Sequence, residues 1–169
     1  MKNYTVRKYQ SSDYSLWNEF VANAKNATFL FHRDFMEYHS DRFEDFSLLV
    51  FDEKNLLKAI LPANRVGDNL YSHQGLTYGG LVISASTMLF EVIQINQVML
   101  SFLYERQILK LHLKIIPTIY NNIPSDEMEY ISFLLLAKLY RRDAIAILDI
   151  TNQVEKSRVR KRGIVKGLK

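Results

Sequence analysis

The sequence predicts a mixed α/β domain in which a mostly antiparallel sheet carries helices on both faces. Two apolar runs, at 46–51 and 56–65, are joined by the polar residues 52–55, which is typical of a β-hairpin. A long stretch that begins after Ser84 or Ser86 repeats its apolar residues every three or four positions, which indicates an amphipathic helix. The chain of 169 residues thus carries both a strand pattern and a helix pattern, which favours strands and helices packed in layers around a shared core.

The other elements follow from local signals in the chain. Alternating apolar residues predict strands, and Ser or Asp before an apolar-periodic stretch predicts the start of a helix. Pro117 ends one predicted strand, because proline cannot donate to a β-ladder. From the N-terminus, the sequence predicts a strand at 4–9, a helix from 11–13 to about 24, a short helix at 35–42, the hairpin at 46–65, strands around 70–71 and 81–83, the long helix to about 106, a strand at 109–116, a helix at 126–140 and a last strand at 144–150.

Charge divides the chain into two parts. The whole sequence has a net charge of +4, but residues 155–169 carry seven Lys or Arg and one Glu, so this tail is +6 and the rest is −2. The basic character therefore belongs to the tail, and it does not predict a nucleic-acid-binding domain. We expect one domain at 1–153 and a basic arm at 154–169 that opens a second half.

Composition excludes several classes of chemistry. The chain has no cysteine, which rules out disulfides, thiolate nucleophiles and Cys-ligated zinc. His32 and His39 lack an HExxH motif and a carboxylate triad, so the sequence predicts no metal site. The N-terminus has no apolar leader and no run approaches the roughly 20 apolar residues of a membrane span, so we expect no transmembrane segment and a cytoplasmic location.

The segment 28–43 concentrates cationic and aromatic side chains. On a helix over 34–42, Tyr38, His39 and Arg42 share one face, because residues three and four apart are neighbours. Together with Arg33 these residues are candidate substrate-binding groups for an anion such as a phosphate. The alternative is an amphipathic helix whose polar residues only contact water.

The segment 71–80 holds three glycines in six residues, which indicates a sharp turn or a close backbone approach. His73 is the group there that titrates nearest neutral pH, and it is the candidate catalytic residue. Tyr71, Gln74 and Tyr78 are candidate substrate-binding residues. Ser72 beside His73 does not form a nucleophile–base pair, because neighbouring strand residues point to opposite faces, and no GxSxG motif is present.

These segments resemble the FemAB-like family, the peptidoglycan interpeptide-bridge aminoacyltransferases and their bacterial relatives. The resemblance rests on the W-x-x-F-V pattern at 17–21, on the strings at 28–43 and 71–80, and on the basic stretch 158–167, and it runs through most of the chain. Members consist of two tandem halves of the GNAT-like acyltransferase fold. The resemblance implies that this chain is the N-terminal half of an acyl or aminoacyl transferase in cell-wall biogenesis.

The same resemblance implies a cleft formed by the 33–42 helix and the 71–80 turn. The acceptor would be a cell-envelope or sugar-linked amine, and the chain would be inactive without its second half or would self-associate. An aminoacyl-tRNA or a nucleotide-linked substrate would bind, with Arg160 and Lys161 as phosphate contacts. A known member has a phosphate-binding lysine near the position of 38–40, where this chain has none, so His39 or Arg42 would take its place.

Two other functions stay open at this stage. One is a catalytically silent scaffold that binds an anion or a partner domain. The other is a CoA-dependent N-acetyltransferase. The spacing Q-G-x-x-x-G-G at 74–80 departs from the Q/R-x-x-G-x-G/A turn of such enzymes, so acetyl-CoA is disfavoured and we predict no cofactor.

Overall fold

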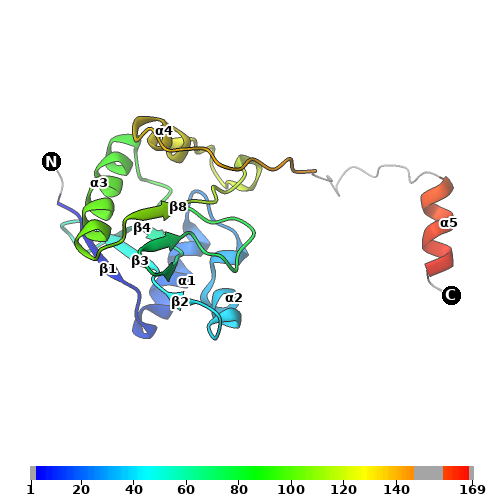
Figure 1. Ribbon diagram of the computed structural model, residues 1–169, viewed down its shortest axis with the longest axis horizontal. Coiled ribbons are helices and arrows are strands. Elements are labelled where there is room, and N and C mark those ends of the chain that lie inside the picture. Colours follow the sequence, from blue (N-terminus) through cyan, green and yellow to red (C-terminus); the bar gives the residue numbers. More distant parts are fainter. Residues whose placement is uncertain (1–2, 147–157, 168–169) are drawn as a thin grey trace. The chain divides into compact units, whose positions relative to one another are not determined.

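The computed structural model describes residues 3–146 and 158–167 and divides the chain into two compact units, Met1–Ala137 and Lys138–Lys169. The predicted boundary at 153/154 falls in residues that the structure does not describe, and it stays a prediction. The first unit contains all the described strands and the helices α1 to α4 (Figure 1). The second contains α5 (Arg158–Gly167), and its residues 138–146 have no regular secondary structure.

The first unit is built on a mixed, mostly antiparallel sheet system, which confirms the predicted fold class. β1 (Thr5–Lys8), β3 (Leu48–Phe51), β4 (Leu57–Leu61) and β7 (Val82–Ile83) pair antiparallel in the order β1-β3-β4-β7. β2 (Glu44–Asp45), β5 (Asn64–Val66), β6 (Asn69–Tyr71) and β8 (Lys110–His112) form a second sheet in the order β2-β5-β6-β8, in which β6 and β8 are parallel. β5 follows β4 after only two residues, so the chain passes directly from the first sheet into the second.

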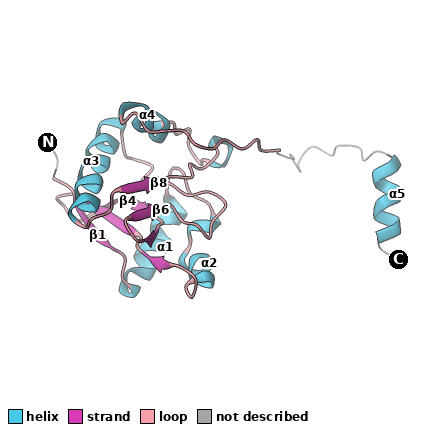
Figure 2. Cartoon of the chain, in the orientation of Figure 1, coloured by secondary structure: helices cyan, strands magenta, loops and turns pink. Residues whose placement is uncertain are grey.

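Helices cover both faces of this sheet system, as Figure 2 shows. α1 (Tyr14–Asn23) and the short α2 (Arg33–Met36) lie on one face, and α3 (Leu89–Glu105) and α4 (Glu127–Leu134) on the other. Strand alternation explains the two cores. Leu48 and Val50 pack with the α3 side, whereas Leu49 and Phe51, one residue on, pack with the α1 side.

Three local predictions were wrong in extent. The helix predicted at 35–42 is α2 followed by a 3-10 turn, Glu37–His39. The helix predicted at 126–140 ends at Leu134, because Leu136 adopts a left-handed conformation with φ of 51°. Residues 144–146 of the predicted last strand are not extended into a ladder, and 147–150 lie outside the described residues. None of the helices in the described ranges is long and apolar enough to cross a bilayer.

Candidate functional site

A small hollow lies where the α2 segment meets the loop that follows β6. Its volume is about 30 Å³, which is room for about two water-sized groups. We call it the Arg33–His73 hollow, after one residue from each of the two segments that the sequence singled out. It is lined by Arg33, Met36, Glu37, Ser40, Phe43, Asp45 and His73.

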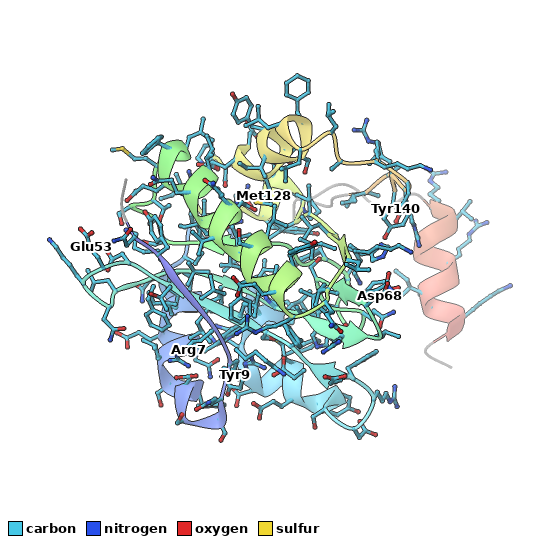
Figure 3. The ribbon with its side chains drawn as sticks, turned by 60° about the vertical axis from the view of Figure 1, so that its left-hand side comes forward. Arg7, Tyr9, Glu53, Asp68, Met128 and Tyr140 are labelled. Carbon is cyan, nitrogen blue, oxygen red and sulfur yellow. The ribbon has the colours of Figure 1, made fainter. Side chains whose placement is uncertain are left out.

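Arg33 is the most deeply buried charged residue of the hollow, with 1% of its surface exposed. Its guanidinium lies over two aromatic rings, with Cζ 3.3 Å from the ring centroid of Tyr9 and 4.2 Å from that of Trp17. Nη1 donates to Asp45 Oδ2 at 2.7 Å, and the backbone N–H donates to Asn18 Oδ1 at 2.8 Å. Figure 3 places Tyr9 at the end of β1, on the α2 side of the sheet. Aromatic faces and one carboxylate therefore fix the orientation of this cation.

The cost of burying the Arg33 charge is only partly offset by its neighbours. Burial lowers the pKa of the guanidinium, and the neighbouring Asp45 carboxylate offsets only part of this effect. Arginine still keeps its charge, because its pKa starts so far above neutrality. Among the side chains that the structure describes, Nε and Nη2 have no hydrogen-bond partner. An unsatisfied buried donor lowers the stability of the fold by about 1–3 kcal/mol, so this unpaired edge destabilises the domain unless a ligand binds it.

His73 enters the hollow from the loop after β6 and is 4% exposed. Its backbone φ is 80°, a left-handed value that few non-glycine residues adopt. Its ring packs edge-on to Phe43 at 5.4 Å, and Nδ1 accepts the N–H of Gly75 at 3.2 Å. The loop thus adopts a strained backbone conformation that holds this ring inside the hollow. Such strain is common at functional positions.

The loop 72–79 is held by hydrogen bonds from Asn64 of β5 and from Lys114, two residues after β8. The Asn64 carboxamide forms two hydrogen bonds with Gln74: Oδ1 accepts the backbone N–H at 2.7 Å, and Nδ2 donates to Oε1 at 2.8 Å. Lys114 closes the other side, since its backbone N–H donates to Ser72 Oγ at 2.8 Å and its ammonium donates to the Leu76 carbonyl. Gln74 is therefore an anchor of the loop, and its predicted role in substrate binding stays a prediction.

The other predicted aromatic residues lie elsewhere. Tyr71, on β6, stacks on His112 of β8 with ring centroids 4.5 Å apart. Tyr78 donates to Thr28 Oγ1 at 3.0 Å and stacks on Tyr120. Neither is among the residues that line the hollow. Their predicted roles in substrate binding stay predictions.

Tyr38 and Arg42 are exposed and also lie outside the lining of the hollow. The His39 backbone closes the 3-10 turn after α2, and Arg160 and Lys161 lie within α5, but the side chains of all three are outside what the structure describes. Within residues 3–146 and 158–167, no cluster of three or more His, Asp or Glu side chains could hold a metal ion.

A carboxylate occupies the first turn of the long helix α3. Glu91 is 8% exposed, its Oε2 accepts the N–H of Met88 at 3.0 Å, and its Oε1 accepts the hydroxyl of Tyr4 at 3.4 Å. The N-terminus of a helix attracts one negative group, and here the chain supplies it. A CoA pyrophosphate at this position would meet a buried negative charge.

Residues 24–26 fill the space beside the strand at 81–83, a feature that the sequence did not reveal. The Asn26 carboxamide acts as a strand partner: Nδ2 donates to the Leu81 carbonyl and Oδ1 accepts the Ile83 N–H, both at 2.9 Å. The Lys25 ammonium donates to Glu127 at the start of α4. The space left between Gly79 and α4 is about 10 Å³, scarcely enough for one water.

Comparison with known proteins gives a limited result. No model of a protein family and no curated protein sequence matches the chain. The crystal structure of the ribosomal-protein-S18-alanine N-acetyltransferase from Escherichia coli is similar in backbone arrangement, with a TM-score of 0.42 and 11% sequence identity. The similarity spans 62% of this chain and 61% of that one.

Proposed function

We propose that this chain is the N-terminal half of a FemAB-like acyl or aminoacyl transferase that acts on a cell-envelope or sugar-linked amine together with a second domain. The observation that supports this proposal is the meeting of the two resemblance segments at one hollow. Arg33 comes from the first segment and His73 from the second, and both are buried there. Buried ionisable groups that line a cavity are candidates for functional residues.

In the proposed reaction an amine attacks the carbonyl carbon of an acyl ester. A C–N bond forms, the C–O bond to the donor breaks, and the proton that the amine loses ends on the oxygen of the released donor hydroxyl. Because His73 Nδ1 accepts the Gly75 N–H, a neutral ring carries its own proton on Nε2. In this state His73 is suited to donate to the developing oxyanion, and a role as general base would require the bond to Gly75 to break.

The need for a second domain is supported by size and by uncovered apolar surface. A hollow of about 30 Å³ contacts only one end of a substrate. On and just after α4, Phe133 and Leu136 are 72% and 88% exposed. Clustered apolar side chains in water are typical of a surface that another domain or a second copy covers.

The scaffold function keeps one observation in its favour. The His73 ring packs against Phe43 and a backbone N–H, which is also how a purely structural histidine is held. A scaffold would bind a ligand or partner without turnover. The CoA-dependent alternative lacks such support, because Glu91 occupies the start of α3 and Asn26 fills the space beside the strand at 81–83.

A transfer assay on the full gene product tests the proposal. Aminoacyl-tRNA and a nucleotide-linked muropeptide serve as donor and acceptor, and the variants are His73→Gln and, as the control, His32→Gln, which lies outside the lining of the hollow. We expect His73→Gln to lower kcat by about a hundredfold or more, with little effect of His32→Gln. Equal turnover in both variants, or no transfer by the wild type, would favour the scaffold. Calorimetric binding of acetyl-CoA would instead favour the N-acetyltransferase.

A further inference from the structure

The guanidinium of Arg33 has one edge engaged and one buried edge that has no acceptor. Nη1 is bound to Asp45, whereas Nε and Nη2, which share the opposite edge, have no acceptor among the described side chains. We propose that this edge binds a carboxylate group of the substrate. This inference rests on the proposed function, and it names the chemical class that the site recognises.

The shape of the unpaired edge favours a planar, two-oxygen ligand. Nε–H and one N–H of Nη2 point in parallel, and this fork matches the two oxygens of a carboxylate. The rings of Tyr9 and Trp17 pack against the guanidinium and restrict its movement. A ligand therefore meets donors that are already oriented, in surroundings where hydrogen bonds are strengthened by the low dielectric.

The charge and size of the hollow favour a carboxylate over a phosphate. Two acidic residues, Glu37 and Asp45, line the hollow beside Arg33. They repel a phosphate, which carries close to two negative charges, more than a monoanion. About 30 Å³, room for about two water-sized groups, also suits the two oxygens of a carboxylate better than the four of a phosphate. Glu37 and Ser40 are exposed, so the hollow opens to solvent on the side of the turn after α2.

A carboxylate held by Arg33 would lie beside His73, since both line the same hollow. The proposed transfer consumes an amine, so the substrate class that satisfies both groups is an amino acid or peptide that carries a free carboxylate near its reacting amine. Arg33 is then a positioning group that fixes the acceptor through hydrogen bonds, and no covalent bond to Arg33 forms or breaks.

Trp17 provides a direct measurement of this binding. It is the only tryptophan of the chain, and Arg33 Cζ lies 4.2 Å from its ring centroid. Sodium acetate is titrated against the full chain at constant ionic strength, with sodium chloride and inorganic phosphate as parallel titrations, while tryptophan emission is recorded. We expect a saturable change with acetate, with a midpoint of about 1–10 mM, as one two-point contact warrants. Chloride should give no saturable change, and phosphate should bind at least threefold more weakly than acetate.

Matched variants separate binding at Arg33 from general salt effects. Arg33→Lys keeps the charge but loses the fork, and we expect at least tenfold weaker binding of acetate. Arg106→Lys is the control, because Arg106 also stacks on an aromatic ring but on the exposed end of α3. If Arg33→Lys does not fold, Asp45→Asn leaves Arg33 in place, removes one negative charge, and should tighten acetate binding.

Three results would overturn the inference: no saturable response to acetate, stronger binding of phosphate than of acetate, or unchanged acetate binding in both Arg33→Lys and Asp45→Asn. The outcome is separable from that of the proposed function. Acetate binding with no acyl transfer by the full gene product would reject the transferase and keep the site. Full transfer activity in a folded Arg33→Lys variant would reject the site and keep the transferase.

Discussion

Gly79 and Ser72 lie so close together that a Cβ on residue 79 would stand 1.8 Å from the carbonyl oxygen of Ser72. The two residues are the ends of the loop that carries His73, and the Gly79 N–H donates to the Lys114 carbonyl at 2.6 Å. The loop therefore closes on itself at a point where no side chain fits, and this contact holds His73 in the hollow.

The first prediction concerns this contact. Gly79→Ala forces the Ser72 backbone to move, and we expect it to lower the free energy of unfolding by about 3 kcal/mol. Gly67→Ala is the comparison, because Gly67 has a φ of 61° but open space around it, so only backbone strain of about 1 kcal/mol applies. Urea unfolding measures both. Equal losses would show that the close approach at Gly79 is relieved elsewhere.

The second prediction concerns the side chain that replaces a strand. Asn26→Ala leaves the Leu81 carbonyl and the Ile83 N–H without their partner, and both are buried. We expect a loss of about 3 kcal/mol in the free energy of unfolding, since each unsatisfied group costs about 1–3 kcal/mol. Asn23→Ala, which removes one exposed hydrogen bond to the Glu19 carbonyl, should change it by less than about 0.5 kcal/mol. Thermal or urea denaturation distinguishes the two.

The third prediction concerns pH and the ion pair between Lys25 and Glu127, whose side chains are 11% and 12% exposed. Burial alone would raise the pKa of Glu127, but hydrogen bonds from Lys25 and Ser125 outweigh it, so the pKa lies below its ordinary value. A lowered pKa stabilises the fold above the ordinary value of about 4.3, and this stabilisation is lost as pH falls through the lowered pKa.

Glu127→Gln should therefore cost about 2 kcal/mol at pH 7, where the pair is intact, and this cost should shrink as pH falls through the lowered pKa of Glu127. The measurement is the free energy of unfolding as a function of pH between about 3 and 7. Glu53→Gln, at an exposed turn, is the control and should follow the wild-type curve. A constant difference between Glu127→Gln and wild type at every pH would contradict the assignment.

The fourth prediction isolates the backbone strain at His73. His73→Ala and His73→Gly both remove the ring and its contact with Phe43, but only glycine accepts a φ of 80° at little cost. We expect His73→Gly to be more stable than His73→Ala by about 1 kcal/mol. Denaturant unfolding of the two variants gives this difference directly. A less stable glycine variant would mean that the loop relaxes once the ring is gone.

Much of the architecture followed from periodicity. The helix predicted from 84–86 to about 106 is α3, and the hairpin predicted at 46–65 contains β3, β4 and β5. These predictions succeed because hydrophobic spacing reports which face of an element is buried, and that information is local. The helix predicted at 126–140 was too long, because its C-terminal half lacks core contacts: Phe133, Leu136 and Tyr140 are exposed.

The candidate site was only partly readable. The segments 28–43 and 71–80 were identified from composition, and the structure brings Arg33 and His73 to one hollow. Nothing in the sequence indicated that Arg33 is buried against two aromatic rings, because its partners Tyr9, Trp17 and Asp45 come from three separate elements. The sequence also did not indicate that Gln74 forms hydrogen bonds with Asn64 that hold the loop.

The sequence by itself determined the fold class, the hairpin and the long helix, and the location of the charge-bearing and glycine-bearing segments. Only the tertiary structure decided which donors of Arg33 are satisfied, that Asn26 pairs with the strand at 81–83, and that Gly79 closes the loop on Ser72. The physical reason is that the spacing of apolar residues along the chain indicates which face of an element is buried. Hydrogen-bond partners and close approaches between distant residues instead depend on how the elements meet in space.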